Sequence, residues 1–152
     1  MTYYDFVKDY MKVEECKNNK KYSSAGHTFC WNKEESTYAE GLYWFYQGDG
    51  FIIDIHDFYI REEIIQNSTY SMADYVSIYT SYIVSANGEK FSPYQTLTAN
   101  SLRTLDFDNI RDDFLFLLHD NSYYLSVSIG FKRELLENHL SSINIDPESF
   151  YG

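Results

Sequence analysis

Residues 41–60, GLYWFYQGDGFIIDIHDFYI, constrain the fold of this chain more than any other segment. Two runs rich in aromatic and β-branched residues flank Gly48-Asp49-Gly50, and this pattern predicts a β-hairpin with a tight turn. A three-residue loop would pair Phe45 with Ile53 across the hairpin. A two-residue Asp49-Gly50 turn would shift the register by one residue and exchange the pairings. We expect the three-residue loop, because it separates apolar from polar side chains.

The three-residue register predicts one apolar face and one mixed face on the hairpin. The apolar face carries Tyr43, Phe45, Phe51, Ile53 and Ile55. The mixed face carries Leu42, Trp44, Tyr46, Asp54, His56 and Phe58. Because polar groups stand among aromatic rings on the mixed face, it is the face where we expect a ligand to bind.

Strand patterns recur along the rest of the chain. Strands are predicted at 26–30, 75–85, 97–105, 114–118 and 123–131, short helices at 2–13 and 132–140, and an irregular connection at 61–71. Asp146-Pro147 marks one more helix start, so close to the last residue that we expect a truncated chain. Strands followed by helices predict a mainly β fold, a β-barrel or jelly roll with a short N-terminal helix and C-terminal helices.

Length and charge narrow the class of protein. The 152 residues, 44% of them hydrophobic, are enough for one domain spanning 1–152 with a substantial core. The formal net charge of −11 argues against nucleic-acid binding by this chain, since a phosphate backbone attracts clustered cations.

We expect no membrane association, because no apolar run approaches the roughly 20 residues of a span. The N-terminus lacks a signal-peptide pattern, so we expect a cytoplasmic protein with Cys16 and Cys30 as reduced thiols.

The sequence offers no pattern for metal binding or catalysis. The chain has four histidines, His27, His56, His119 and His139. They are too far apart to form the His-x-His pair of a cupin-type metal site. Asp54, His56 and Asp57 could form a carboxylate–imidazole pair, but no nucleophile motif or glycine-rich phosphate loop accompanies them. We therefore expect no metal, no cofactor and no enzymatic activity.

A small-molecule site is the remaining prediction. We expect its aromatic wall to be formed by Trp44, Tyr46, Tyr79 and Tyr124. Asp54 and His56 would be its polar anchors. Aromatic faces with a carboxylate suit a sugar or a cationic metabolite.

Three blocks of the chain carry a family resemblance. They are 41–63 with its strand ending in His-Asp-Phe, 75–100 with its Ser-Pro-Tyr segment, and 125–140, where a strand gives way to a helix. Together they resemble the N-terminal half of AraC-type transcriptional regulators from Gram-positive bacteria. These blocks cover about half of the chain.

The resemblance implies a cupin-type barrel that binds an effector and dimerises through helices. In that family a separate C-terminal domain with two helix-turn-helix units binds DNA, and this sequence lacks that half. The expectation is therefore an effector-binding and dimerisation domain, truncated after residue 152 and forming a homodimer. The alternative is a free-standing cupin-like protein, either a small-molecule binder or an isomerase-type enzyme.

Overall fold

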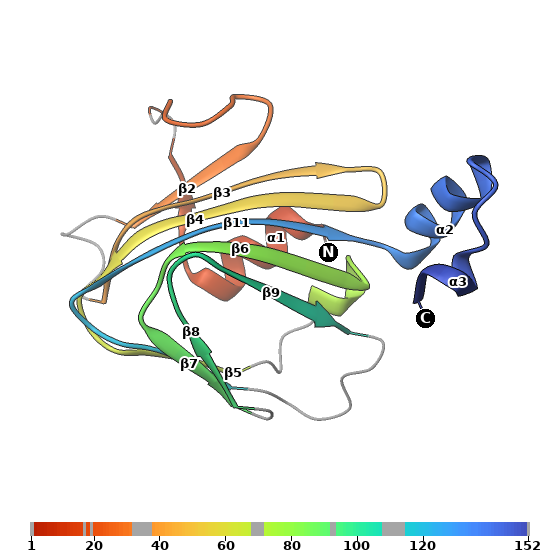
Figure 1. Cartoon of the computed structure of the whole chain (residues 1–152). Helices are drawn as coiled ribbons and strands as arrows, with labels where there is room; N and C mark the ends of the chain where they lie inside the picture. The colour runs from red at the N-terminus through yellow and green to blue at the C-terminus, as the bar shows by residue number, and fades with distance from the viewer. Residues whose placement is uncertain are drawn as a thin grey trace.

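A computed structural model of the chain describes residues 2–16, 18, 20–31, 38–67, 72–91, 94–107 and 115–151. These residues form two antiparallel β-sheets, one helix near the N-terminus and two near the C-terminus (Figure 1). The prediction of a mainly β fold with terminal helices is thus confirmed. A closed barrel was also predicted, but the two sheets remain separate, each with its own edge strands. No helix among the described residues is long and apolar enough to cross a bilayer.

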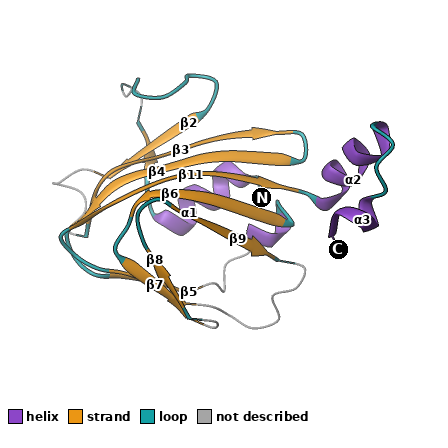
Figure 2. Cartoon of the chain, viewed as in Figure 1, coloured by secondary structure: helices purple, strands orange, loops and turns teal. Residues whose placement is uncertain are grey.

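The large sheet has seven strands and the small sheet has four (Figure 2). In spatial order the large sheet contains β1 (Glu14–Glu15), β2 (His27–Trp31), β3 (Ala39–Gly48), β4 (Phe51–Ile60), β11 (Ser122–Phe131), β6 (Ile78–Ser85) and β9 (Ser101–Asp106). The small sheet contains β5 (Ile64–Asn67), β10 (Leu115–Leu118), β7 (Gly88–Phe91) and β8 (Gln95–Leu97). The predicted strands therefore exist, with ends that differ by a few residues.

One predicted connection contains a strand. Residues 61–71 were expected to be irregular, yet Ile64–Asn67 forms β5, paired with all four residues of β10. The sequence signal for this strand was short, since only Ile64 and Ile65 within β5 are β-branched. The strand that pairs with β5 also lies far along the chain. Residues 68–71 of that prediction lie outside the described residues.

The predicted hairpin register is wrong by one residue. Gly48 pairs with Phe51 and Phe45 pairs with Asp54, so β3 and β4 are joined by the two-residue Asp49-Gly50 turn. Gly50 has φ +82°, the left-handed conformation that favours glycine. The prediction failed because it assumed that polar groups avoid the apolar face. Here Asp54 lies on the buried face, where hydroxyl groups supply its hydrogen bonds.

Helix α1 (Tyr3–Met11) covers the inner face of the large sheet. A capping box starts the helix, since the side chains of Thr2 and Asp5 each accept a hydrogen bond from the other's backbone N–H. Tyr3 and Val7 are buried, and the Tyr3 ring lies edge-on to Phe45 with 4.8 Å between ring centroids. The helix thus closes one side of the space between the sheets.

The core lies between the sheets and under α1. Its largest fully buried apolar side chains come from the helix, from four strands of the large sheet, from one strand of the small sheet and from the segment before β6: Val7, Phe29, Tyr43, Phe45, Ile52, Ile60, Val76, Ile83 and Leu97. Burial of such side chains is worth roughly 1.5–3 kcal/mol each, and it fixes the inner face of the sheet.

Two helices follow the last strand, as predicted. Helix α2 (Arg133–Ser142) and helix α3 (Pro147–Tyr151) extend beyond the turn end of β3 and β4 (Figure 1). The Asp146 carboxylate accepts a hydrogen bond from the Glu148 N–H at the start of α3. Leu140 is buried, whereas Leu135 is 40% exposed, so the helix pair leaves apolar surface uncovered.

The two cysteines form a disulfide, which corrects the prediction of reduced thiols. Cys16 directly follows β1, and Cys30 lies in β2 opposite Glu14, with 5.7 Å between the two cysteine Cα atoms. The sequence contained no paired-cysteine motif. Only the pairing of β1 with β2 brings these residues together.

We expect reduction of this disulfide to destabilise the fold. The bond closes a loop with a sequence separation of 14 residues, and a loop of this length is worth about 3 kcal/mol through the entropy of the unfolded chain. Urea unfolding with and without a thiol reductant measures the difference. The Cys16→Ser/Cys30→Ser double variant should have the same free energy of unfolding as the reduced protein, and the reductant should not change it. Equal stability in both conditions would show that the crosslink adds nothing.

Candidate functional site

A cavity of about 70 Å³ lies between the two sheets, beneath α1. The large sheet contributes Tyr43, Asp54, His56, Tyr79, Arg103 and Tyr124 to its lining. The small sheet contributes Phe116 and Leu118, and α1 contributes Phe6 and Val7. The cavity therefore combines an apolar cover with a polar wall, as small-molecule sites do.

Strand register brings the polar wall together. One row across β3, β4, β11, β6 and β9 consists of Phe45, Asp54, Ser128, Ser81 and Arg103. All five side chains of this row are buried. Two serines thus lie between a carboxylate and a guanidinium group on the inner face.

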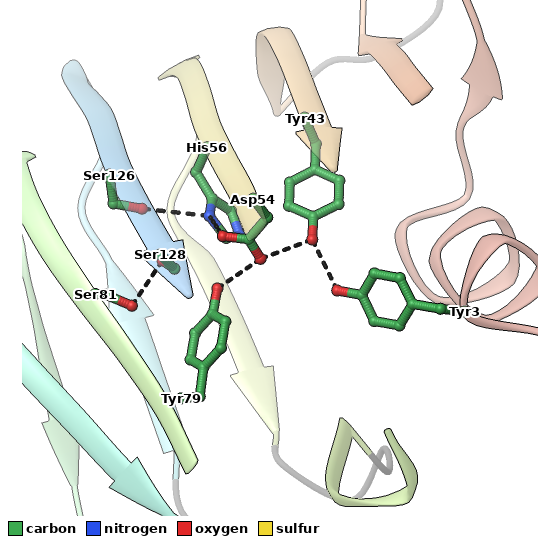
Figure 3. A network of polar contacts seen from close by, with 8 residues as sticks. All are labelled: Tyr3, Tyr43, Asp54, His56, Tyr79, Ser81, Ser126 and Ser128. Atoms are coloured by element: carbon green, nitrogen blue, oxygen red, sulfur yellow. Dashed lines mark hydrogen bonds and ion pairs between the residues drawn. The ribbon is translucent and has the colours of Figure 1, made fainter. Parts of the chain in front are cut away.

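Asp54 is the centre of a hydrogen-bond network (Figure 3). Its side chain is 1% exposed, and its Oδ2 atom accepts hydrogen bonds of 2.7 Å from the hydroxyl groups of Tyr43 and Tyr79. The Tyr3 hydroxyl from α1 lies 2.7 Å from that of Tyr43, which links the helix to the network. The Oδ1 atom of Asp54 has no hydrogen-bond partner among the described residues. Buried carboxylate oxygens are rarely left without a partner, so this atom is a candidate ligand contact.

The two tyrosine partners of Asp54 resist ionisation. Burial raises the pKa of Tyr43 well above 10, and the negative charge of Asp54 raises it further. The pKa of Tyr79 is raised for the same two reasons. Both hydroxyl groups therefore remain donors to Asp54 over the whole physiological pH range.

His56 lies on the next row, beside Asp54. Its Nδ1 atom is 3.2 Å from Ser126 Oγ and 3.8 Å from Asp54 Oδ1. A serine–histidine–carboxylate triad needs the nucleophile and the carboxylate on different ring nitrogens. Here one nitrogen faces both, so the arrangement does not match a hydrolase triad. Burial lowers the pKa of His56, which keeps the ring neutral at pH 7.

Arg103 was missed by sequence analysis. It is 7% exposed on β9, its guanidinium carbon lies 4.6 Å from the Phe116 ring centroid, and its Nε atom has no hydrogen-bond partner among the described residues. The alternation of side chains in the predicted strand 97–105 contained a signal for a buried Arg103, since this residue shares a face with Leu97 and Leu105. A buried arginine on an apolar strand face indicates a charged partner.

The predicted site residues fall on two faces of the sheet. Asp54, His56, Tyr79 and Tyr124 line the cavity. Trp44 and Tyr46 do not, because the register of the hairpin places them on the outer face. There the Trp44 Nε1 donates a 2.9 Å hydrogen bond to the Ser23 carbonyl, and Tyr46 is 37% exposed.

Two further findings concern metal binding and similarity to known proteins. No cluster of three or more histidine, cysteine, aspartate or glutamate residues that could hold a metal ion occurs within the part of the chain that the structure describes. No protein-family model matches the chain, and a search of curated proteins finds no match.

Proposed function

We propose that this chain is a small-molecule-binding domain whose ligand occupies the cavity between the sheets. The observation that carries the proposal is the Oδ1 atom of Asp54, a buried acceptor with no partner among the described residues, on a side chain that lines the cavity. Arg103 lines the same cavity, and its buried donor Nε also has no partner among the described residues. Leaving such groups without partners costs about 1–3 kcal/mol each, and a ligand removes that cost.

We further propose that the domain is the effector-binding part of an AraC-type transcription regulator. The supporting evidence is the sequence resemblance, whose first block covers most of β3 and all of β4, and whose last block covers most of β11 and of α2. In this proposal a separate helix-turn-helix domain binds DNA in the cytoplasm. The net charge of −11 supports the view that this domain does not bind DNA itself.

The geometry favours binding over catalysis. Ser126 and the Asp54 carboxylate both face the same ring nitrogen of His56, Nδ1, which does not match a hydrolase triad. A free-standing cupin-like binder or isomerase-type enzyme is the second candidate. One observation favours its enzyme form, since a neutral imidazole in a cavity can accept a proton. Purified protein that interconverts a bound compound would establish this second candidate.

A thermal-shift screen tests the binding proposal. We expect a library of small polar metabolites to contain compounds that raise the unfolding temperature of the parent protein. For such a compound Asp54→Asn should weaken binding roughly 5- to 150-fold, the equivalent of about 1–3 kcal/mol. The matched control is Asp57→Asn. Asp57 is 3% exposed on the same strand, but it points to the outer face, where Lys21 and Tyr22 bind it. Equal weakening by both variants would contradict a cavity site.

Dimerisation through the C-terminal helices is also part of the proposal. Leu135, Ile143 and Ile145 are 40%, 50% and 42% exposed on and after α2, which leaves an apolar surface suited to a two-fold interface. We expect the protein to sediment as a dimer at high micromolar concentration, and Ile143→Glu to shift it to monomer. Ile65→Glu is the control, because Ile65 is 63% exposed on the small sheet. A parent protein that remains monomeric would refute this interface.

A further inference from the structure

We propose that the ligand of the cavity is a small zwitterion, an amino acid or a compound of the same chemistry. Its ammonium group binds Asp54 and its carboxylate binds Arg103. This inference rests on the proposed function, since it names the chemical class of ligand for the same site.

The anionic end of the cavity lacks a cationic partner. Around Asp54 the bonded donors are the neutral hydroxyls of Tyr43 and Tyr79, and both contact Oδ2. His56 Nδ1 is 3.8 Å from Oδ1, which is too long for a hydrogen bond, and the lowered pKa keeps the ring neutral. A buried carboxylate with only neutral partners favours a cation more than it favours a neutral hydroxyl. A ligand ammonium group supplies both the charge and the missing donor.

At the cationic end, Arg103 has no carboxylate partner among the described residues. The Phe116 ring lies against its guanidinium group, and its Nε atom has no hydrogen-bond partner in the described parts of the chain. A second buried cation, Lys90, lies on β7 in register with Phe116. Burial lowers the pKa of Lys90, and the positive charge of Arg103 lowers it further, so the two cations are close. A ligand carboxylate relieves this repulsion and pairs with Arg103 in planar geometry.

The spacing of the two ends suits a short ligand. Asp54 and Arg103 share one row with Ser128 and Ser81 between them, so their Cα atoms are three strand spacings apart, roughly 14 Å. The arginine side chain spans about half of that distance. The two serines between them are small, buried and hydrogen-bonded to each other at 2.8 Å, while Asp54 and Arg103 both line the cavity. The charges of both Asp54 and Arg103 act on the pKa of His56, so both lie near that ring.

The volume of the cavity sets the size of the ligand. A cavity of about 70 Å³ holds roughly five water molecules, or a ligand the size of alanine. A sugar is larger and carries no charge for either end. A simple cation would leave Arg103 unpaired, so the expectation of a sugar or a cationic metabolite is replaced by a zwitterion.

Calorimetric titration with a panel of matched size tests the proposal. The probes are L-alanine and β-alanine as zwitterions, propionate as a carboxylate, isopropylamine as an ammonium ion, and glycerol as a neutral compound. We expect at least one zwitterion to bind roughly 10-fold or more tightly than propionate, isopropylamine and glycerol. Tighter or equal binding of any single-charge or neutral probe would overturn the proposal.

One variant and its control test the end of the cavity that would bind the carboxylate. Arg103→Gln should reduce zwitterion binding to the level of isopropylamine, while Asp57→Asn should leave it unchanged. If Arg103→Gln fails to fold by circular dichroism, Arg103→Lys replaces it, with an expected loss of several-fold. If glycerol binds and Asp54→Asn weakens its binding, the cavity is still a small-molecule site, but the proposal that its ligand is a zwitterion is overturned. No binding of any probe by the parent protein would overturn the zwitterion, and the metabolite screen would then decide the function separately.

Discussion

Asp54→Ala is expected to lower the free energy of unfolding by about 2–4 kcal/mol, because it removes a buried acceptor of two charge-assisted hydrogen bonds. The Tyr79 hydroxyl would lose its carboxylate partner, and Tyr43 would retain only Tyr3. The carboxylate thus holds α1 onto the sheet through these tyrosines as well as facing the cavity. Urea unfolding of the ligand-free protein measures the effect.

The control for this variant is Asp120→Ala. Asp120 is exposed in the turn before β11, so its replacement should change stability by less than about 0.5 kcal/mol. Asp54→Asn keeps the size of the side chain and should cost less than the alanine variant. If Asp54→Ala proved as stable as Asp120→Ala, the buried network around Asp54 would not contribute to folding.

High pH is expected to unfold the protein through Tyr43 and Tyr79. In the unfolded chain tyrosine ionises near pH 10, whereas both folded hydroxyls have a pKa raised well above 10. The folded state therefore retains more protons above pH 10, and the stability that these tyrosines contribute is lost as the pH rises. Each of the two groups lowers the free energy of unfolding by up to about 1.4 kcal/mol for each pH unit above 10, for as long as its folded hydroxyl stays protonated.

Urea unfolding at a series of alkaline pH values measures this slope. Tyr22 adds to it, because burial and the Asp57 carboxylate raise its pKa to about 12. The Tyr43→Phe/Tyr79→Phe double variant is less stable at neutral pH, but its stability should fall less steeply above pH 10. The matched control is Tyr94→Phe, since Tyr94 is 64% exposed. An equal slope in the parent and the double variant would show that the two hydroxyls are not buried.

Sequence patterns predicted the elements of the fold better than the faces of its strands. The alternation in 123–131 placed β11 to within one residue, because a long strand with one buried face repeats its signal. The hairpin register was wrong, because one face holds both the apolar core and the polar wall. Once Asp54 lies opposite Phe45, segregation of polarity no longer identifies the register.

The candidate site was predicted in part for the same reason. Asp54, His56, Tyr79 and Tyr124 line the cavity, while Trp44 and Tyr46 lie on the other face. Arg103 comes into one row with Asp54 only through the pairing of β9, β6 and β11, and pairing between distant strands leaves no local signal. The disulfide was missed because it too depends on strand pairing.

Backbone amide chemical shifts test the central claim most directly. The protein would be titrated with the compound that stabilises it most, and shifts would be mapped onto both faces of the large sheet. We predict that the largest changes occur at Asp54, Ser81, Arg103 and Ser128, with small changes at the outward-facing residues Val127 and Leu102, which are 45% and 67% exposed. A ligand site between the sheets would be contradicted if the changes were concentrated on the outer face or on α2 and α3. In that case Asp54, Ser81, Arg103 and Ser128 would be unaffected.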